Sequence, residues 1–135
     1  MSTHPNILYV EDDALSREVM QALLTRKLGF QNITIFEDSR HFMEKLREMD
    51  AGPDVIFLDI HMEPIDGFEM LRQIREDVAF RSTKIVALTA SVMNEEVKML
   101  RAAGFNGVLA KPLNVDAFPD ALERILGGEQ VWIIK

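Results

Sequence analysis

Acidic side chains follow two apolar segments that have the character of buried strands. Residues 7–10 read ILYV and are followed by Glu11 and Asp12, and residues 55–58 read VIFL and are followed by Asp59. Two carboxylates about 4 Å apart repel each other by roughly 4 kcal/mol at an effective dielectric constant of about 20. If these strand ends meet, protonation or a bound cation has to relieve the repulsion.

Two further strand-like segments end on residues that suit phosphoryl transfer. Thr89 and Ala90 follow residues 84–88, and Lys111 follows residues 107–110. An aspartate can be the covalent nucleophile in such a transfer, while a metal ion and an ammonium group neutralise charge on the transferring group. The hydroxyl group of Thr89 can hydrogen-bond a phosphoryl oxygen. Because the candidate metal ligands are all oxygen atoms, the sequence favours Mg²⁺ over zinc.

The segments that must position these residues alternate between strand and helix. A strict alternation predicts a parallel sheet with helices on both faces, so we expect a three-layer α/β/α sandwich with five strands in the flavodoxin-like order 2-1-3-4-5. That order makes the first and third strands neighbours and brings Glu11, Asp12 and Asp59 together. The expected strands are residues 7–10, 33–36, 55–58, 84–88 and 107–110, and the expected helices are residues 14–28, 38–49, 67–76, 94–103 and 114–126.

With these residues at these strand ends, the chain resembles a receiver domain of a two-component response regulator, of the stand-alone type typified by the chemotaxis regulator. The resemblance covers nearly the whole chain, from Asn6 to Leu126. It implies that Asp59 accepts a phosphoryl group from the phosphohistidine of a sensor kinase or phosphotransfer protein. The matching pieces are Glu11-Asp12, Asp59, Asp66-Gly67, Thr89-Ala90 and Lys111-Pro112.

The resemblance also implies a role for each residue around the acceptor. Asp12, Asp59 and the backbone carbonyl group of His61 would hold Mg²⁺, and Glu11 would reach the ion mainly through water. For the imidazole of His61 we expect a modest influence on the lifetime of the phosphoryl group rather than a role as a metal ligand, since a lone imidazole has no partner there.

Two further residues take their roles from the same resemblance. Lys111 would pair with the phosphoryl group, and Thr89 would move towards it. The peptide bond between Lys111 and Pro112 would be cis, because only an X–Pro bond adopts the cis form at low cost.

Two positions depart from the pattern that the resemblance implies. Glu63 stands where a proline is usual, four residues after the acceptor, and Pro64 follows it. We expect an altered loop shape and an additional acid near the site. Val108 stands where an aromatic switch residue is usual, three positions before Lys111, which puts the usual relay to the output surface in doubt.

Other classes of function fit the residues less well. An aspartyl-phosphate hydrolase of the haloacid dehalogenase type would have a second aspartate where His61 stands. A flavodoxin-like cofactor binder would have a phosphate-binding loop in place of the acids after residue 10, which repel a phosphate. An unphosphorylated receiver that serves as an interaction scaffold remains an alternative. We expect a signalling domain that catalyses only its own phosphorylation and dephosphorylation, and not an enzyme acting on other substrates.

Composition limits the partners and the location. Fifteen basic residues against 22 acidic residues give a net charge of −7, which argues against nucleic acid or an anionic membrane as a partner. Without cysteine, no disulfide or zinc–thiolate site can form. No stretch reaches the roughly 18 apolar residues of a membrane span, and the first residues do not read as a signal peptide. We expect a cytoplasmic protein whose output comes from a downstream protein target or from onward phosphotransfer.

The last residues form an apolar tail after the expected receiver domain, residues 1–128. Residues 129–135 follow two glycines and contain the run VWII at residues 131–134. Such a run needs cover, because exposed apolar β-formers promote aggregation. One account is an intramolecular clasp beside the fifth strand or against the last helix. The account that we favour at this point is a homodimer that uses the tail and the face formed by the fourth helix, fifth strand and fifth helix.

Overall fold

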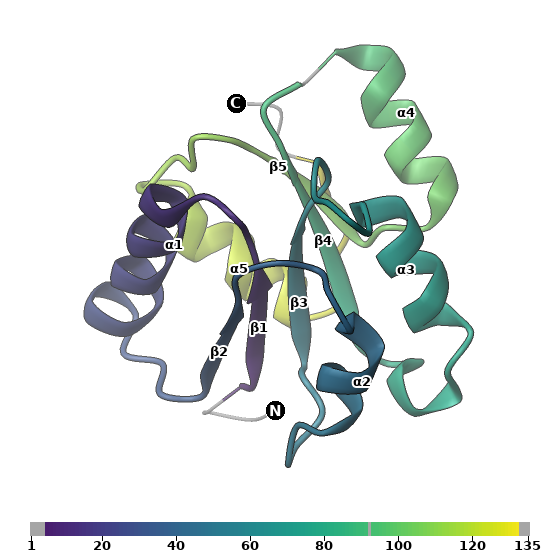
Figure 1. Ribbon diagram of the computed structural model, residues 1–135. Coiled ribbons are helices and arrows are strands. Elements are labelled where there is room, and N and C mark those ends of the chain that lie inside the picture. Colours follow the sequence, from purple (N-terminus) through teal and green to yellow (C-terminus); the bar gives the residue numbers. More distant parts are fainter. Residues whose placement is uncertain (1–4, 92, 133–135) are drawn as a thin grey trace.

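The protein is built around one parallel sheet, which a computed structural model describes for residues 5–91 and 93–132 (Figure 1). The sheet has six strands in the order β2-β1-β3-β4-β5-β6, and every neighbouring pair is parallel. The expected order of the first five strands is confirmed, and a sixth strand extends the sheet beyond β5. The strands are β1 (Ile7–Val10), β2 (Ile33–Phe36), β3 (Val55–Asp59), β4 (Lys84–Thr89), β5 (Gly107–Ala110) and β6 (Val131–Trp132).

Helices cover both faces of the sheet, as the alternation of elements predicts. Side chains of α1 and α5 pack on one face, and side chains of α2, α3 and α4 pack on the other. The connections are therefore βα crossovers, which bring all the carboxyl ends of the strands to one edge. The helices are α1 (Ala14–Gln21), α2 (Phe42–Arg47), α3 (Gly67–Arg75), α4 (Asn94–Ala103) and α5 (Phe118–Leu126), with a π-helical segment (Ala22–Lys27) after α1 and a 3₁₀ turn (Val78–Phe80) after α3.

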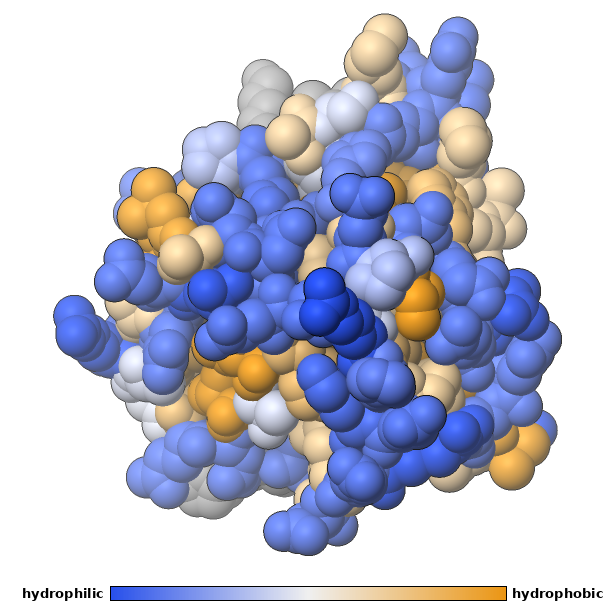
Figure 2. All heavy atoms as spheres, in the orientation of Figure 1, coloured by the Kyte–Doolittle hydropathy of each residue, from blue (hydrophilic) through white to orange (hydrophobic). Residues whose placement is uncertain are grey.

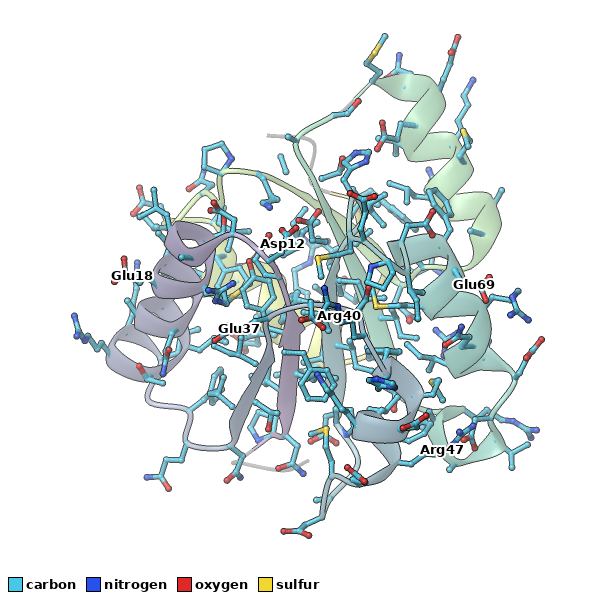
Figure 3. The ribbon with its side chains drawn as sticks, in the orientation of Figure 1. Asp12, Glu18, Glu37, Arg40, Arg47 and Glu69 are labelled. Atoms are coloured by element: carbon cyan, nitrogen blue, oxygen red, sulfur yellow. The ribbon has the colours of Figure 1, made fainter. Side chains whose placement is uncertain are left out.

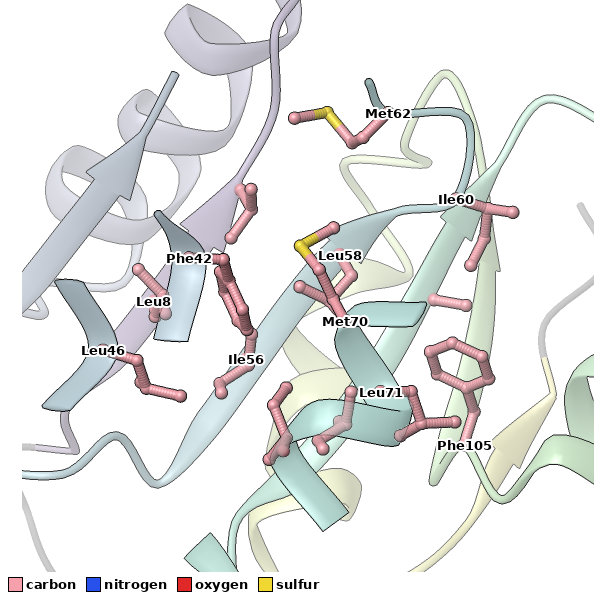
Figure 4. Packing of buried hydrophobic residues seen from close by; sticks show 14 of the residues in the cluster. Leu8, Phe42, Leu46, Ile56, Leu58, Ile60, Met62, Met70, Leu71 and Phe105 are labelled. Atoms are coloured by element: carbon pink, nitrogen blue, oxygen red, sulfur yellow. The ribbon is translucent and has the colours of Figure 1, made fainter. Parts of the chain in front are cut away.

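Alternate residues of each central strand serve opposite cores. In β3, Ile56 and Leu58 face the α2–α3–α4 side, whereas Val55 and Phe57 face the α1–α5 side. All four side chains are fully buried. Figure 4 shows Ile56 and Leu58 among side chains from the helices on their face, including Met70. Burial on both faces explains why this strand reads as a continuous apolar run rather than an alternating one.

Three of the expected helices differ from the observed ones at their ends. The first expected helix ends as a π-helical segment. The second begins at Phe42 rather than near residue 38, because the carboxylate of Asp38 accepts a hydrogen bond from the backbone N–H of Arg40 and forms a turn instead. The last begins at Phe118 rather than Asn114, whose side chain likewise accepts hydrogen bonds from the two N–H groups of residues 116 and 117.

The apolar tail pairs with its own chain where the structure describes it. Val131 and Trp132 form β6 and lie parallel to β5, in register with Gly107 and Val108. Val131 is buried, and Trp132 is partly buried against the α2–α3–α4 core. Of the two accounts of the tail, these two residues follow the intramolecular clasp, and residues 133–135 lie outside the described residues. The homodimer stays a prediction.

Within residues 5–91 and 93–132, every helix is too short or too polar to cross a membrane.

Close approach of two backbones at β5 and β6 yields a test of the clasp. A Cβ atom on Gly107 would lie 2.6 Å from the carbonyl oxygen of Val131, which is too close. We predict that Gly107→Ala costs about 1–3 kcal/mol of unfolding free energy by overpacking and displaces β6. Trp132 is the single tryptophan, so its emission should shift to the red. The control is Gly52→Ala, where the added atom meets only Phe80 at 3.9 Å. Equal stability and equal emission of the two variants would contradict the observed pairing.

Candidate functional site

Three strands deliver charged side chains to a single point at the carboxyl edge of the sheet. Glu11 follows β1, Asp59 ends β3 and Lys111 follows β5. The Nζ atom of Lys111 lies 2.7 Å from Oε1 of Glu11 and 3.2 Å from Oδ2 of Asp59. Oxygen atoms of Glu11, Asp12 and Asp59 all lie within 4.8 Å of one another. Figure 3 shows Asp12 at the end of β1, at this edge. The sequence-predicted acids and the lysine are therefore brought together.

Glu11 is held rigidly although it is fully buried. Its Oε1 atom accepts a hydrogen bond of 2.8 Å from the hydroxyl group of Tyr9, and its Oε2 atom accepts one of 3.2 Å from the backbone N–H of Asp13. Burial, and then the neighbouring Asp59 carboxylate, raise the pKa of Glu11 above its ordinary value. Burial is the main cause that raises the pKa of Tyr9, and the charge of the neighbouring Glu11 is the second cause. The hydroxyl group of Tyr9 therefore keeps its proton and remains a hydrogen-bond donor. Sequence reasoning missed Tyr9 because a tyrosine inside a strand reads as core.

The balance of charge at the site is negative. Burial by itself lowers the pKa of Lys111, but the carboxylates of Glu11 and Asp59 outweigh burial and raise it above its ordinary value. Lys111 is therefore a cation that compensates one carboxylate. Three carboxylate groups and one ammonium group leave a formal excess of two negative charges at the site. A divalent cation would cancel this excess.

The donor set fits Mg²⁺ and does not suit a softer metal. Glu11, Asp12 and Asp59 offer carboxylate oxygens, with Asp12 exposed and the other two buried. Hard oxygen donors with an open side towards water are what Mg²⁺ takes in proteins. The backbone N–H of His61 donates to Oδ1 of Asp59 at 3.1 Å and so orients that carboxylate. The carbonyl group of His61 as a fourth ligand stays a prediction.

Thr89 lies at the end of β4, where the sequence places it, but its hydroxyl group is engaged elsewhere. It donates to Oε1 of Glu96, in the first turn of α4, at 3.0 Å, and it accepts from the backbone N–H of Ser91 at 3.0 Å. The imidazole Nε2 atom of His61 lies 3.7 Å from the same Glu96 oxygen. The imidazole therefore lies beside a carboxylate of α4, and its expected influence on the phosphoryl group stays a prediction. Sequence reasoning missed Glu96 because it examined strand ends, whereas Glu96 reaches the site from a helix.

A helix cap and a close backbone contact hold the loop after β3 in place. Asp66 caps α3 by accepting a hydrogen bond from the backbone N–H of Glu69 at 2.9 Å. A Cβ atom on Gly67 would lie 2.9 Å from the Cα atom of Ile60, so this close packing needs glycine. Glu63 is exposed, and its bond to Pro64 is cis. The predicted cis bond between Lys111 and Pro112 is also present, and the effect of Glu63 on the loop and the site stays a prediction.

A groove of about 700 Å³ opens beside the site, between the loop after β3 and helix α4. The face shown in Figure 2 is mostly hydrophilic, and hydrophobic side chains gather over α4. Met93, the residue just before α4, and Met99, in α4, are 69% and 60% exposed. His61 and Glu96 both line the groove.

Comparison with known proteins places the chain among signalling domains. The family model described as "Response regulator receiver domain" matches residues 7–123. The sensor histidine kinase AruS of Pseudomonas aeruginosa is 38% identical over 121 residues, which cover 88% of this chain and 12% of that protein. The chemotaxis protein CheY1 of Helicobacter pylori is 27% identical over 123 residues, which cover 90% of this chain and 96% of that protein. The chain thus spans a small part of the kinase and nearly all of the chemotaxis protein.

Solved structures agree in fold. The receiver domain of a sensor histidine kinase from Pseudomonas aeruginosa, determined with a magnesium ion coordinated in its active site cleft, superposes with a TM-score of 0.79 at 28% identity and covers 93% of this chain and 100% of that one. The chemotaxis response regulator CheY4 of Vibrio cholerae gives a TM-score of 0.80 at 28% identity and covers 91% and 99%. The expected fold class is therefore confirmed.

The excess of negative charge predicts a paradoxical effect of one substitution. Asp12→Asn removes one exposed carboxylate, so we expect the metal-free protein to become more stable by about 1 kcal/mol, the repulsion of two charges about 4 Å apart in water. The same variant should lose most of the increase in melting temperature that Mg²⁺ gives the wild type, because ligand-dependent stabilisation follows affinity. Thermal unfolding with and without Mg²⁺ measures both effects. A metal-free variant less stable than the wild type, with the Mg²⁺ effect retained, would contradict the account.

Proposed function

The chain belongs to the response regulator receiver domain family, and from that premise we propose that Asp59 accepts a phosphoryl group from a phosphohistidine in a Mg²⁺-dependent reaction. The donor would be a sensor histidine kinase or a phosphotransfer protein. The phosphorylated chain would signal by binding a protein target or by passing the phosphoryl group on to a phosphotransfer histidine.

The proposed reaction is a transfer between two side chains. A carboxylate oxygen of Asp59 attacks phosphorus, a P–O bond forms, and the P–N bond to the donor imidazole breaks. The leaving imidazole keeps the electron pair and takes up a proton from water. Lys111, 3.2 Å from Oδ2 of Asp59, is placed to neutralise charge on the phosphoryl oxygens. When bound by Glu11, Asp12 and Asp59, Mg²⁺ would add further neutralisation of the same oxygens.

The observation that carries the proposal is the way in which Asp59 is held. It is 6% exposed, one of its oxygen atoms accepts from the N–H of His61, and the other pairs with Lys111. A carboxylate fixed from both sides next to an ammonium group and two more acids is arranged for nucleophilic attack on a phosphoryl group. A purely structural scaffold has no need for this excess of buried charge, which costs stability.

The residues around Asp59 also argue against the alternative of an aspartyl-phosphate hydrolase. An aspartyl-phosphate hydrolase needs a general acid or base beside its nucleophile to activate the leaving group or water. The side chain two residues after Asp59 is His61, which turns towards Glu96. The residues around Asp59 therefore favour transfer to and from the chain over turnover of a small substrate.

Replacement of the acceptor gives the direct test. Asp59→Asn should abolish phosphorylation by a small phosphoramidate donor in the presence of Mg²⁺, because the amide is not a nucleophile towards phosphorus. The fold should remain intact, since the amide is nearly isosteric and removes a repelling charge. Intact-mass spectrometry reads the phosphoryl group. Asp50→Asn, an exposed aspartate before β3, is the control and should be phosphorylated like the wild type. Full phosphorylation of Asp59→Asn would disprove the assignment.

The homodimer is a separate proposal, made for the face formed by α4, β5, α5 and the tail. Because β6 covers the edge of β5, the dimer would have to use the outer side of β6 and α4. Deletion of residues 131–135 should then lower the mass measured by light scattering from dimer to monomer. A wild type that is monomeric at high concentration, with and without phosphorylation, would contradict the homodimer and favour the intramolecular clasp.

A further inference from the structure

Helix α4 contacts the phosphorylation site with its first turn and the C-terminal strand with its last. In the first turn, Glu96 accepts a hydrogen bond of 3.0 Å from the hydroxyl group of Thr89 and lies 3.7 Å from the imidazole of His61. In the last turn, the guanidinium group of Arg101 lies over the ring of Trp132, 4.8 Å from its centroid. One rigid helix of ten residues therefore joins the two places.

Trp132 places an aromatic side chain next to Val108 of β5. It lies in register with Val108, the neighbouring residue of β5, which occupies the position of the usual aromatic switch. Val108 is buried, and Trp132 is partly buried against the core that α4 helps to form. The ring of Trp132, from β6, thus lies beside Val108, the position at which receiver domains usually have an aromatic residue.

We propose that Trp132 on β6 is the element that senses phosphorylation of Asp59, through α4. This inference rests on the proposed function. A phosphoryl group on Asp59 brings new acceptor oxygens and negative charge close to Thr89 and Glu96. The hydroxyl group of Thr89 has one hydrogen to donate, so a bond to a phosphoryl oxygen ends its bond to Glu96. The added negative charge also repels the carboxylate of Glu96.

Release of Glu96 moves α4, and Arg101 moves with it. Within the described residues, which end at 132, two residues of β6 pair with β5, and side-chain contacts such as that between Arg101 and Trp132 help to hold them there. Loss of that contact exposes Trp132 at the edge of the sheet. The surface that a protein target meets beside α4 then carries an exposed tryptophan in the phosphorylated form and a covered one in the resting form.

The single tryptophan makes this proposal measurable in the full-length chain. The chain is phosphorylated with a phosphoramidate donor and Mg²⁺, the extent is read by intact mass, and tryptophan emission and acrylamide quenching are recorded on the same sample. We expect a red shift and stronger quenching on phosphorylation of the wild type. Asp59→Asn, treated in the same way, should show neither the added mass nor the shift.

We call the proposed path from Asp59 through Glu96 and α4 to Trp132 the relay. Two matched pairs of variants test the relay separately from phosphorylation itself. Compared with the wild type at an equal extent of phosphorylation, read by intact mass, Glu96→Gln should lose most of the emission shift, while Glu95→Gln, an exposed neighbour, should keep it. Arg101→Ala should show red-shifted emission already in the resting form and little further change. Lys98→Ala, an exposed cation one turn earlier in α4, should behave like the wild type.

The outcomes distinguish this inference from the proposed function. If mass shows full phosphorylation while emission and quenching of the wild type stay unchanged, the relay through α4 is wrong and the phosphoryl acceptor stands. An equal shift in Glu96→Gln and the wild type also overturns the relay. If no mass is added to the wild type, the proposed function fails, and the inference fails with it.

Discussion

The structure depends on the mutual repulsion of three carboxylates that the sheet forces together. Glu11, Asp12 and Asp59 come from two neighbouring strands, and the parallel arrangement leaves their side chains at the same edge. One lysine from β5 offsets part of the charge. Left alone, such a cluster costs folding free energy, whereas in the proposed function the same carboxylates hold a divalent cation and supply the nucleophile.

The remaining architecture holds this cluster in place. Burial of strand residues on both faces fixes β1, β3 and β4 relative to one another, so the positions of the acids cannot relax apart. Tyr9 and the backbone N–H of Asp13 bind the two oxygens of Glu11, and His61 binds one oxygen of Asp59. In the part of the chain that the structure describes, no buried side-chain polar atom lacks a hydrogen-bond partner. The cost of the buried acids is therefore confined to their charge.

Much of the fold and most of the site could be predicted because they follow from local patterns. Apolar runs mark the five long strands, and their alternation with helices predicts a parallel sheet, whose flavodoxin-like order brings Glu11 and Asp59 together. Helix starts were less predictable, because an asparagine or aspartate such as Asn114 forms a turn by the same hydrogen bonds with which it caps a helix. Glu96 and Trp132 could not be assigned from sequence. Their partners come from distant segments, and only the packed structure brings them together.

The central claim is that Asp59 is the phosphoryl acceptor of an acid cluster that needs Mg²⁺. The most direct measurement is to phosphorylate the wild type with and without Mg²⁺, trap any acyl phosphate by borohydride reduction, and map the reduced residue by tandem mass spectrometry. The account predicts that the label is found at Asp59 and depends on Mg²⁺. Labelling of a different residue, or equal labelling of Asp59 in the presence of a chelator, would contradict it.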